Sequence, residues 1–153
     1  MNLSIRKMTE EDLEPLYLLL SDSRVMKYLE PPFSKERTAR FLRECGLCGK
    51  PLVWSVDNED GFIGYVIFHD YDESSLEIGW VLYPEYWGKG CASELARRMI
   101  VRGLALGKQL VIECDREQGA AKRIAQKNGF AFEGMSGGLE VYRLKESSGF
   151  SPV

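Results

Sequence analysis

The stretch from Leu76 to Arg98 changes from a strand pattern to a helix pattern across a pair of glycines, and it constrains the fold more than any other feature. The strand ends at Tyr83-Pro84, a short loop follows, and Gly88-Lys89-Gly90 opens the helix. Glycines at a helix entrance let the backbone approach a ligand closely. The free N–H groups of the first turn, together with the helix dipole, suit a phosphate or pyrophosphate. The segment predicts an anion site at a strand–loop–helix corner; a tight connection whose glycines only solve a steric problem stays open on the spacing alone.

Two common nucleotide-binding motifs do not occur at this corner. The sequence contains no G-x-x-x-x-G-K-[ST], so it has no P-loop. The residue three positions after Gly90 is Ser93, so no third glycine completes the dinucleotide-binding pattern G-x-G-x-x-G. The predicted anion site is therefore neither a P-loop nor a Rossmann loop.

Hydrophobic periodicity along the rest of the chain predicts a single mixed α/β domain. Strands are expected at 3–8, 52–56, 62–68, 76–83, 110–114, 130–133 and 139–144. Helices are expected at 10–21, at 24–29, after Ser34 as a capping residue, from 90 to 107 and at 120–127. The buried face of the first helix is expected to carry Leu13, Leu16, Tyr17 and Leu20.

Composition narrows the classes of function. With 153 residues the chain fits one domain, and its net charge of -3 gives no electrostatic case for nucleic acid, which usually demands a basic face. The longest apolar stretches, such as Leu16–Leu20, fall far below the roughly 18 residues that span a bilayer. The N-terminal residues contain no signal-peptide pattern. We therefore expect a cytoplasmic protein that acts on neither nucleic acid nor membranes.

The run Tyr86-Trp87-Gly88-Lys89-Gly90-Cys91-Ala92, followed by Glu94-Leu95, resembles the acetyl-CoA pyrophosphate loop of the GNAT superfamily of N-acetyltransferases. The family pattern is Gln/Arg-x-x-Gly-x-Gly/Ala, onto which Trp87, Gly90 and Ala92 fall. The tryptophan variant resembles the branch that includes the ribosomal-protein N-terminal acetyltransferases. The segments 5–13 and 24–33 and the Lys127-Asn128-Gly129-Phe130 helix ending are similar to that branch as well. The resemblance covers residues 3 to about 145.

This resemblance implies a fold and a division of the chain. The fold class is α/β (mixed α+β), with a central, mostly antiparallel sheet of six to seven strands that is splayed at the middle and flanked by about four helices. Residues 1–145 would form the GNAT-like acetyltransferase domain. Residues 146–153 would form a flexible C-terminal tail.

The resemblance also implies acetyl-CoA as a co-substrate and no metal. The pantetheine arm would pair with the strand before the loop, near Trp80 and Leu82, as an added strand. Backbone N–H groups would hold the pyrophosphate at Gly88, Lys89, Gly90, Cys91, Ala92 and Ser93. Gln118 stands where relatives tend to carry an asparagine that touches the pantetheine, and it could still reach that group.

Glu77, in the strand expected to face the thioester, is the candidate catalytic base. An alkylammonium with a pKa near 10.4 is almost wholly charged at neutral pH, so a base is useful. The alternative is a carboxylate that faces solvent or pairs with a basic neighbour. A backbone N–H near Trp80–Leu82 would stabilise the oxyanion. Ala125 occupies the position of the tyrosine that protonates the leaving sulfur in many relatives, so the proton donor is unassigned.

Three other residues or pairs have an interpretation that assigns them no function. His69, the sole histidine, could relay protons, but a turn histidine is more often simply exposed. Cys45 and Cys48 supply half the ligands of a zinc site without a second pair, and we interpret them as incidental. Cys91 needs no nucleophilic role, since the family transfers the acetyl group directly.

The leading hypothesis is an N-acetyltransferase that acts on a primary amine, either a protein N-terminus or a small molecule. Residues 22–35 and 135–138 would hold this acceptor. The alternative is a weak or inactive module that binds acyl-CoA as a sensor, which the missing tyrosine favours. A longer acyl chain or an alcohol acceptor is a third hypothesis. A homodimer is also open, because exposed edges of split sheets often associate.

Overall fold

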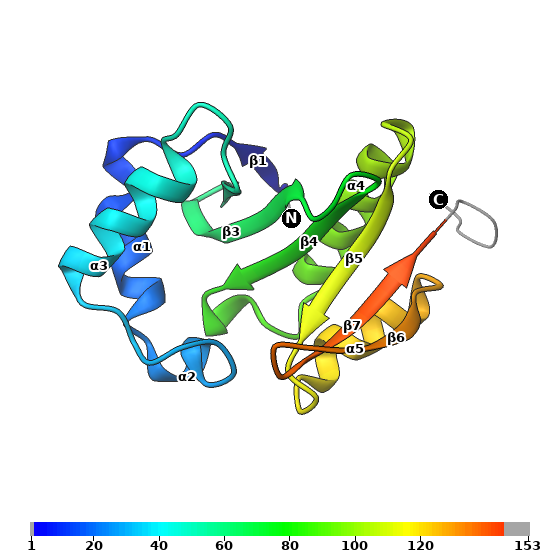
Figure 1. Ribbon diagram of the computed structural model, residues 1–153. Coiled ribbons are helices and arrows are strands. Elements are labelled where there is room, and N and C mark those ends of the chain that lie inside the picture. The colour runs from blue at the N-terminus through cyan, green and yellow to red at the C-terminus, as the bar shows by residue number, and fades with distance from the viewer. Residues whose placement is uncertain (1, 146–153) are drawn as a thin grey trace. The chain divides into compact units, whose positions relative to one another are not determined.

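The computed structural model describes residues 2–145, which form two compact units (Figure 1). The first unit contains residues 2–67 and 80–92, and the second contains residues 68–79 and 93–145. The strands are β1 (Ser4–Arg6), β2 (Val53–Asn58), β3 (Gly61–Asp70), β4 (Ser75–Leu82), β5 (Gln109–Cys114), β6 (Ala131–Ser136) and β7 (Leu139–Leu144). The α-helices are α1 (Leu13–Leu20), α2 (Ser23–Met26), α3 (Lys35–Phe41), α4 (Cys91–Ala105) and α5 (Gly119–Lys127). Single helical turns lie at Glu10–Asp12, Leu42–Gly46 and Pro84–Tyr86.

The strands are hydrogen-bonded in the order β1-β2-β3-β4-β5-β7-β6. The pairs β1/β2, β2/β3, β5/β7 and β6/β7 are antiparallel, whereas β4/β5 is parallel. The parallel register covers only Ser75–Glu77 against Gln109–Val111, although β4 runs on to Leu82. The mixed α/β class and the mostly antiparallel sheet are confirmed, with seven strands and five α-helices in residues 2–145.

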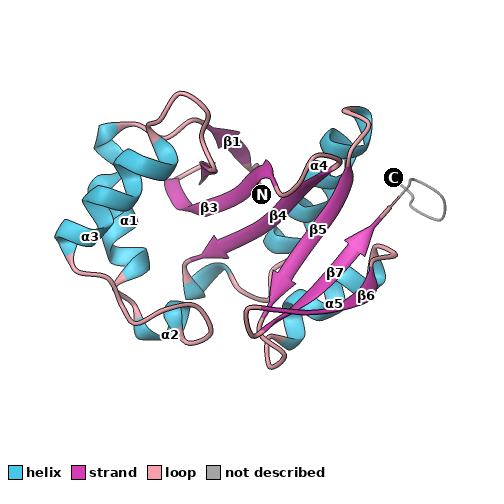
Figure 2. Cartoon of the chain, viewed as in Figure 1, coloured by secondary structure: helices cyan, strands magenta, loops and turns pink. Residues whose placement is uncertain are grey.

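In the first unit, capping residues fix where the helices begin. The Thr9 N–H donates to Asp12 Oδ2 at 2.9 Å, and the two residues form a capping box at the turn that leads into α1. Ser34 Oγ accepts from the Arg37 N–H at 3.1 Å and caps α3, as predicted. The helix predicted at 24–29 is shorter and ends at Met26. Helices α1 and α3 lie side by side in Figures 1 and 2.

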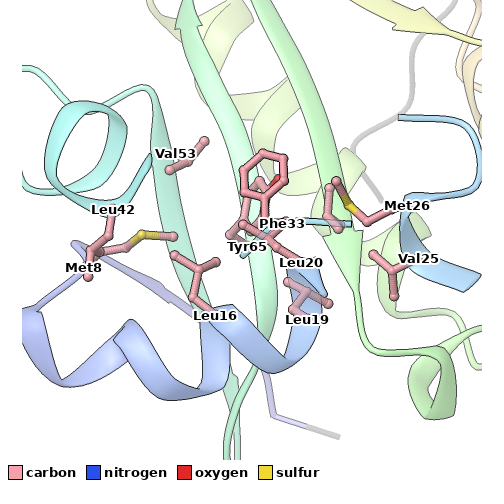
Figure 3. Packing of buried hydrophobic residues seen from close by; sticks show 11 residues of the cluster. Met8, Leu16, Leu19, Leu20, Val25, Met26, Phe33, Leu42, Val53 and Tyr65 are labelled. Atoms are coloured by element: carbon pink, nitrogen blue, oxygen red, sulfur yellow. The ribbon is translucent and has the colours of Figure 1, made fainter. Parts of the chain in front are cut away.

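The core of the first unit forms around one face of α1 (Figure 3). Leu16, Leu19 and Leu20 are buried to 1% exposure or less, and each contributes roughly 1.5–3 kcal/mol by leaving water. Leu13 and Tyr17 are only partly buried, so the buried face is rotated toward Leu19 relative to the predicted one. The cluster comprises Met8, Leu16, Leu19, Leu20, Val25, Met26, Phe33, Leu42, Val53, Tyr65 and Val81.

Gly64 determines how closely β3 approaches the end of β4. A Cβ on Gly64 would lie 2.1 Å from the Val81 carbonyl oxygen and 2.9 Å from Leu82 Cα. Only a residue without a side chain allows this approach. The Tyr83 N–H then donates to the Ile63 carbonyl at 3.0 Å, which extends the contact beyond the end of β4.

In the second unit, β5 is the buried strand that its continuous apolar run predicts. Leu110, Val111 and Ile112 are at most 2% exposed. Helix α4 packs closely on this strand, because a Cβ on Gly103 would lie 2.5 Å from Leu110 Cδ1. Helix α5 ends at Lys127, with Asn128 as the C-cap residue and Gly129 after it in the left-handed conformation (φ +86°), as the predicted Asn128-Gly129 ending requires.

Most element boundaries agree with the prediction to within a few residues. The hairpin β6/β7 is longer than expected on its first strand, which runs to Ser136 rather than Glu133. The predicted tail, residues 146–153, lies outside the described residues.

Candidate functional site

A short pinned turn connects β4 to α4 in the first unit. Pro84 begins a single 3-10 turn, and the Trp87 indole Nε1–H donates to the Leu82 carbonyl at 3.0 Å. Trp87 is 49% exposed, so this hydrogen bond rather than burial fixes the position of its side chain. The hydrogen bond ties the start of the glycine loop to the last residue of β4. The sequence motif indicated the tryptophan but not this anchoring contact.

The two loop glycines have backbone conformations that suit glycine. Gly88 has φ +70° and Gly90 has φ +86°, in the left-handed region that other residues adopt only at a cost. A Cβ on either glycine would meet no protein atom within 4 Å. The glycines are therefore required by the turn rather than by packing, and the loop surface is open to solvent on that side.

The first turn of α4 follows directly on this loop. Gly88, Lys89 and Gly90 are exposed, Cys91 is buried and begins the helix, and Ala92 and Ser93 follow it. N–H groups of a first helical turn have no partner within the helix and carry the positive end of its dipole. This geometry suits a phosphate group, so the loop stays a predicted phosphate site.

The two β4 residues predicted to meet the pantetheine differ in exposure. Trp80 is partly buried, whereas the Leu82 side chain is only 3% exposed. Leu82 can therefore offer a ligand its backbone but not its side chain. Its carbonyl already accepts the indole N–H of Trp87.

Glu77, the predicted base, lies on β4 in the second unit opposite Val111 of β5. Its side chain is 21% exposed, and its Oε1 lies 3.3 Å from Nε2 of His69. The expectation that His69 is simply exposed is wrong: its ring is 23% exposed because β3 runs to Asp70 and brings the ring against β4. The hydrogen bond to Glu77 is the largest influence on His69 and raises its pKa above the ordinary value.

Tyr71 forms a second polar pair in the same unit. Its hydroxyl donates to Glu113 Oε2 at 2.6 Å, and this hydrogen bond raises the pKa of Tyr71 to about 12. The phenol therefore stays protonated at neutral pH. Sequence reasoning missed this pair, because Tyr71 lies in a turn and Glu113 on a strand 42 residues away.

Gln118 and Ala125 lie at the start and within the body of α5. Gln118 Oε1 accepts from the Asp115 N–H at 2.7 Å, so its carbonyl is used to hold the loop before the helix. Ala125 is fully buried. Its methyl side chain carries no hydroxyl, so this position supplies no proton donor.

A shallow pocket of about 370 Å³ lies in the first unit beside α2. Its lining residues fall within the segment 22–35 that the sequence predicted to hold the acceptor. They are Ser23, Met26, Lys27, Leu29, Glu30, Pro31 and Pro32. Glu30 is paired with Arg37 at 2.5 Å, so its charge is compensated from α3.

None of the four cysteines, Cys45, Cys48, Cys91 and Cys114, forms a disulfide in residues 2–145. Cys48 Sγ contacts the Lys50 carbonyl at 3.3 Å. Within residues 2–145, no group of three His, Cys, Asp or Glu side chains could hold a metal ion. In that same part of the chain no helix is long and apolar enough to cross a bilayer.

The predicted site residues fall into two groups, one in each compact unit. Trp80, Leu82 and residues 88–92 follow one another along a continuous segment of the first unit. Glu77, Ser93 and Gln118 belong to the second unit, and Glu77 is brought together there with His69.

The chain is similar to several known proteins. Residues 2–131 match the family model described as an acetyltransferase (GNAT) domain. The chain is 33% identical over 137 residues to the uncharacterized N-acetyltransferase YnaD of Bacillus subtilis (strain 168), covering 86% of this chain and 81% of YnaD.

Solved structures give the same result. A GNAT-family acetyltransferase from Bacillus anthracis superposes with a TM-score of 0.80 at 30% identity, covering 94% of this chain and 93% of that one. The ribosomal-protein α-N-acetyltransferase RimL in complex with coenzyme A gives a TM-score of 0.77 at 18% identity, covering 97% and 96%. At that identity the second likeness concerns the fold alone.

Proposed function

This chain belongs to the GNAT acetyltransferase family and is an N-acetyltransferase, and from this premise we propose that it transfers acetyl directly from acetyl-CoA to a primary amine. The amine would be a protein N-terminus or a small molecule. The observation that carries the proposal is the exposed loop from Gly88 to Gly90 at the start of α4, pinned to β4 by Trp87.

Acetyl-CoA would be held chiefly by the backbone. N–H groups from Gly88, Lys89, Gly90, Cys91, Ala92 and Ser93 would donate to the pyrophosphate. Lys89 is exposed and would add a positive charge near the same phosphates. The pantetheine would pair along β4 near Trp80 and Leu82, and Gln118 would contact it from the start of α5.

Glu77 would act as the base. Transfer needs the acceptor ammonium to lose a proton before its nitrogen attacks the thioester carbon. A backbone N–H between Trp80 and Leu82 would stabilise the oxyanion that forms. The C–S bond then breaks and the thiolate takes up a proton, so that the products are the N-acetylated amine and CoA.

The fully buried Ala125 favours one competing function, a module that binds acyl-CoA without turnover. Many relatives place a hydroxyl at this position to protonate the leaving sulfur, and this chain has none there. A longer acyl chain or an alcohol acceptor is a further alternative, which competition between acyl-CoA esters would reveal.

Calorimetric titration with acetyl-CoA tests the cofactor site. We expect binding by the wild-type protein and its loss in Gly90→Trp, because an indole on Gly90 would occupy the open side of the loop. Gly49→Trp is a matched control, since Gly49 is also exposed, a Cβ added to it would meet no atom within 4 Å, and it lies outside the loop. Absence of binding by the folded wild-type protein would refute the proposal.

Thiol release on a panel of amines and N-terminal peptides tests turnover. We expect Glu77→Gln to lower kcat about 10²–10⁴-fold at neutral pH with unchanged affinity for acetyl-CoA. Binding without turnover on every acceptor would instead support the sensor function.

A further inference from the structure

His69 and Glu77 lie on neighbouring strands of the second unit and form a close pair. His69 Nε2 is 3.3 Å from Glu77 Oε1, and His69 Nδ1 is 2.9 Å from the carbonyl oxygen of Asp70. Both side chains are about four-fifths buried, with exposures of 23% and 21%. Both ring nitrogens therefore face an oxygen atom.

The two contacts give the pair a site for one proton. A carbonyl oxygen only accepts, so Nδ1 carries a hydrogen in its contact with Asp70. A neutral imidazole has one N–H, which leaves a lone pair on Nε2 facing the carboxylate. The lone pair of Nε2 and the carboxylate of Glu77 can therefore take up one proton between them, and the contact then becomes a hydrogen bond.

Other charged and titratable groups surround this pair. On its own strand and the turn after it, His69 is followed by Asp70 and Tyr71. The charge of Glu77 also raises the pKa of Tyr71. The Tyr71 hydroxyl donates a hydrogen bond to Glu113 of β5. Glu113 raises the pKa of Tyr71, whereas the charge of Arg143 on β7 lowers it. The charges nearest the ring are those of Glu77 and Asp70, both of which favour a protonated imidazole.

We propose that His69 is the proton-accepting partner of Glu77 in acetyl transfer, which rests on the function proposed above. The acceptor ammonium gives a proton to the Glu77 carboxylate, which passes it to Nε2 of His69. The step starts from an ammonium, a carboxylate and a neutral imidazole. It ends with a neutral amine, a carboxylate and an imidazolium, so charge and protons balance. The Asp70 carbonyl keeps the ring in the tautomer whose Nε2 can accept.

A positioning role alone would leave a different signature. In that case His69 would only donate to Glu77 and keep its carboxylate in place, as a glutamine could also do. His69→Gln therefore separates the two roles, because its side-chain amide can donate to a carboxylate but cannot take up a proton.

The ring can be observed without any assay of activity, because the chain contains one histidine. In ¹⁵N-labelled protein without a histidine tag, a pH titration of the imidazole nitrogens reports His69 alone. We expect a titration midpoint above the ordinary value of about 6.5 and a fall in Glu77→Gln. A midpoint that is the same in wild type and Glu77→Gln would overturn the shared proton.

The pH dependence of kcat at saturating substrates tests the transfer. We expect an acid limb in the wild type at the midpoint that the ring titration gives. In His69→Gln we expect kcat to fall about 10²-fold and this limb to disappear from the pH range in which the ring titrates, because the imidazole is absent. Deprotonation of the acceptor ammonium can add a limb to the pH profile of kcat, and all variants would then show that limb.

Tyr71→Phe is the matched control, since it removes a neighbouring hydroxyl but neither member of the pair. It should leave the acid limb in place. A His69→Gln variant with wild-type kcat and an unmoved limb would overturn the proposal. If the protein acetylates no amine at all, the proposed function fails, and the ring titration still decides whether the pair shares a proton.

Discussion

At the scale of single residues, the carboxylate of Asp12 shows how a buried charge is compensated. It is 4% exposed and accepts from Arg6 at 2.8 and 2.9 Å, from the Thr9 N–H and from Ser55 Oγ at 3.0 Å. Burial by itself would raise the pKa of Asp12, but the hydrogen bonds from these groups lower it below the ordinary value. The ionised form is therefore the one that the folded state stabilises.

Asp12→Asn should lower the free energy of unfolding by about 3 kcal/mol at pH 7, because it leaves the partly buried Arg6 with Asp57 as its one carboxylate partner among residues 2–145. A folded pKa below the unfolded one means that this stabilisation is fully present above about pH 4 and is lost as the pH falls further. Urea unfolding at pH 7 and pH 3 should show a smaller difference between variant and wild type at the lower pH.

Glu14→Gln is the control for this change. Its pair with Lys35 is 63% and 54% exposed, so we expect a loss of about 0–1 kcal/mol. Equal losses for both variants would mean that Asp12 contributes no more than a surface charge does.

Trp87→Phe should weaken acetyl-CoA binding about fivefold without changing the melting temperature much. It removes the indole N–H that holds the loop to Leu82, and one such hydrogen bond contributes roughly 1 kcal/mol. Calorimetry measures the affinity. Trp54→Phe is the matched control, since Trp54 Nε1 is buried with no hydrogen-bond partner among residues 2–145, and its affinity should stay at the wild-type value.

At the scale of elements, β3 and the end of β4 depend on a glycine. Gly64→Ala should destabilise the protein by about 3 kcal/mol or more, because its Cβ would lie within 3 Å of the backbone at both Val81 and Leu82. Urea unfolding measures the loss, and the soluble fraction on expression replaces it if the variant does not fold.

Gly61→Ala on the same strand separates packing from backbone conformation. Gly61 has φ +118° but a Cβ added to it would meet no atom within 4 Å, so we expect only the conformational cost of roughly 1–2 kcal/mol. A larger loss at Gly61 than at Gly64 would contradict the close approach of the two strands.

The elements differ in how well sequence reasoning located them. Capping residues and glycines act within a few positions, so Thr9, Ser34 and Gly129 marked helix ends correctly. The buried face of α1 was predicted less accurately, because Leu13, Tyr17 and Leu19 all fit a helical stripe. Only the packing of the first unit selects Leu19 over its neighbours.

At the scale of the whole molecule, the thiols report how the chain is packed. Cys91 and Cys114 are 3% exposed, and burial raises the pKa of Cys114 to about 11 and also raises that of Cys45. At pH 8 we expect one thiol, Cys48, to react rapidly with a disulfide reagent in the native protein, and four to react in denaturant.

Cys48→Ser should abolish the rapid phase. Reductant should leave the melting temperature unchanged, because none of the four cysteines forms a disulfide in residues 2–145. Three or more rapid thiols in the native wild type would contradict the burial of Cys91 and Cys114.

The sequence by itself determined the order of the elements, the GNAT family and the loop at the start of α4. These features depend on interactions between residues close in the chain: periodicity, caps, and glycines whose positive φ values the turn requires. The family's loop pattern is contiguous, so it could be recognised without a structure.

Only the tertiary structure decided the partners of the charged groups. Ser55 reaches Asp12 across 43 positions, Glu113 reaches Tyr71 across 42, and His69 meets Glu77 from a neighbouring strand. Each contact depends on strand register and on the direction of a side chain, which no local pattern specifies. For this reason His69 was expected to be exposed, although the structure places it against the carboxylate that we propose as the base.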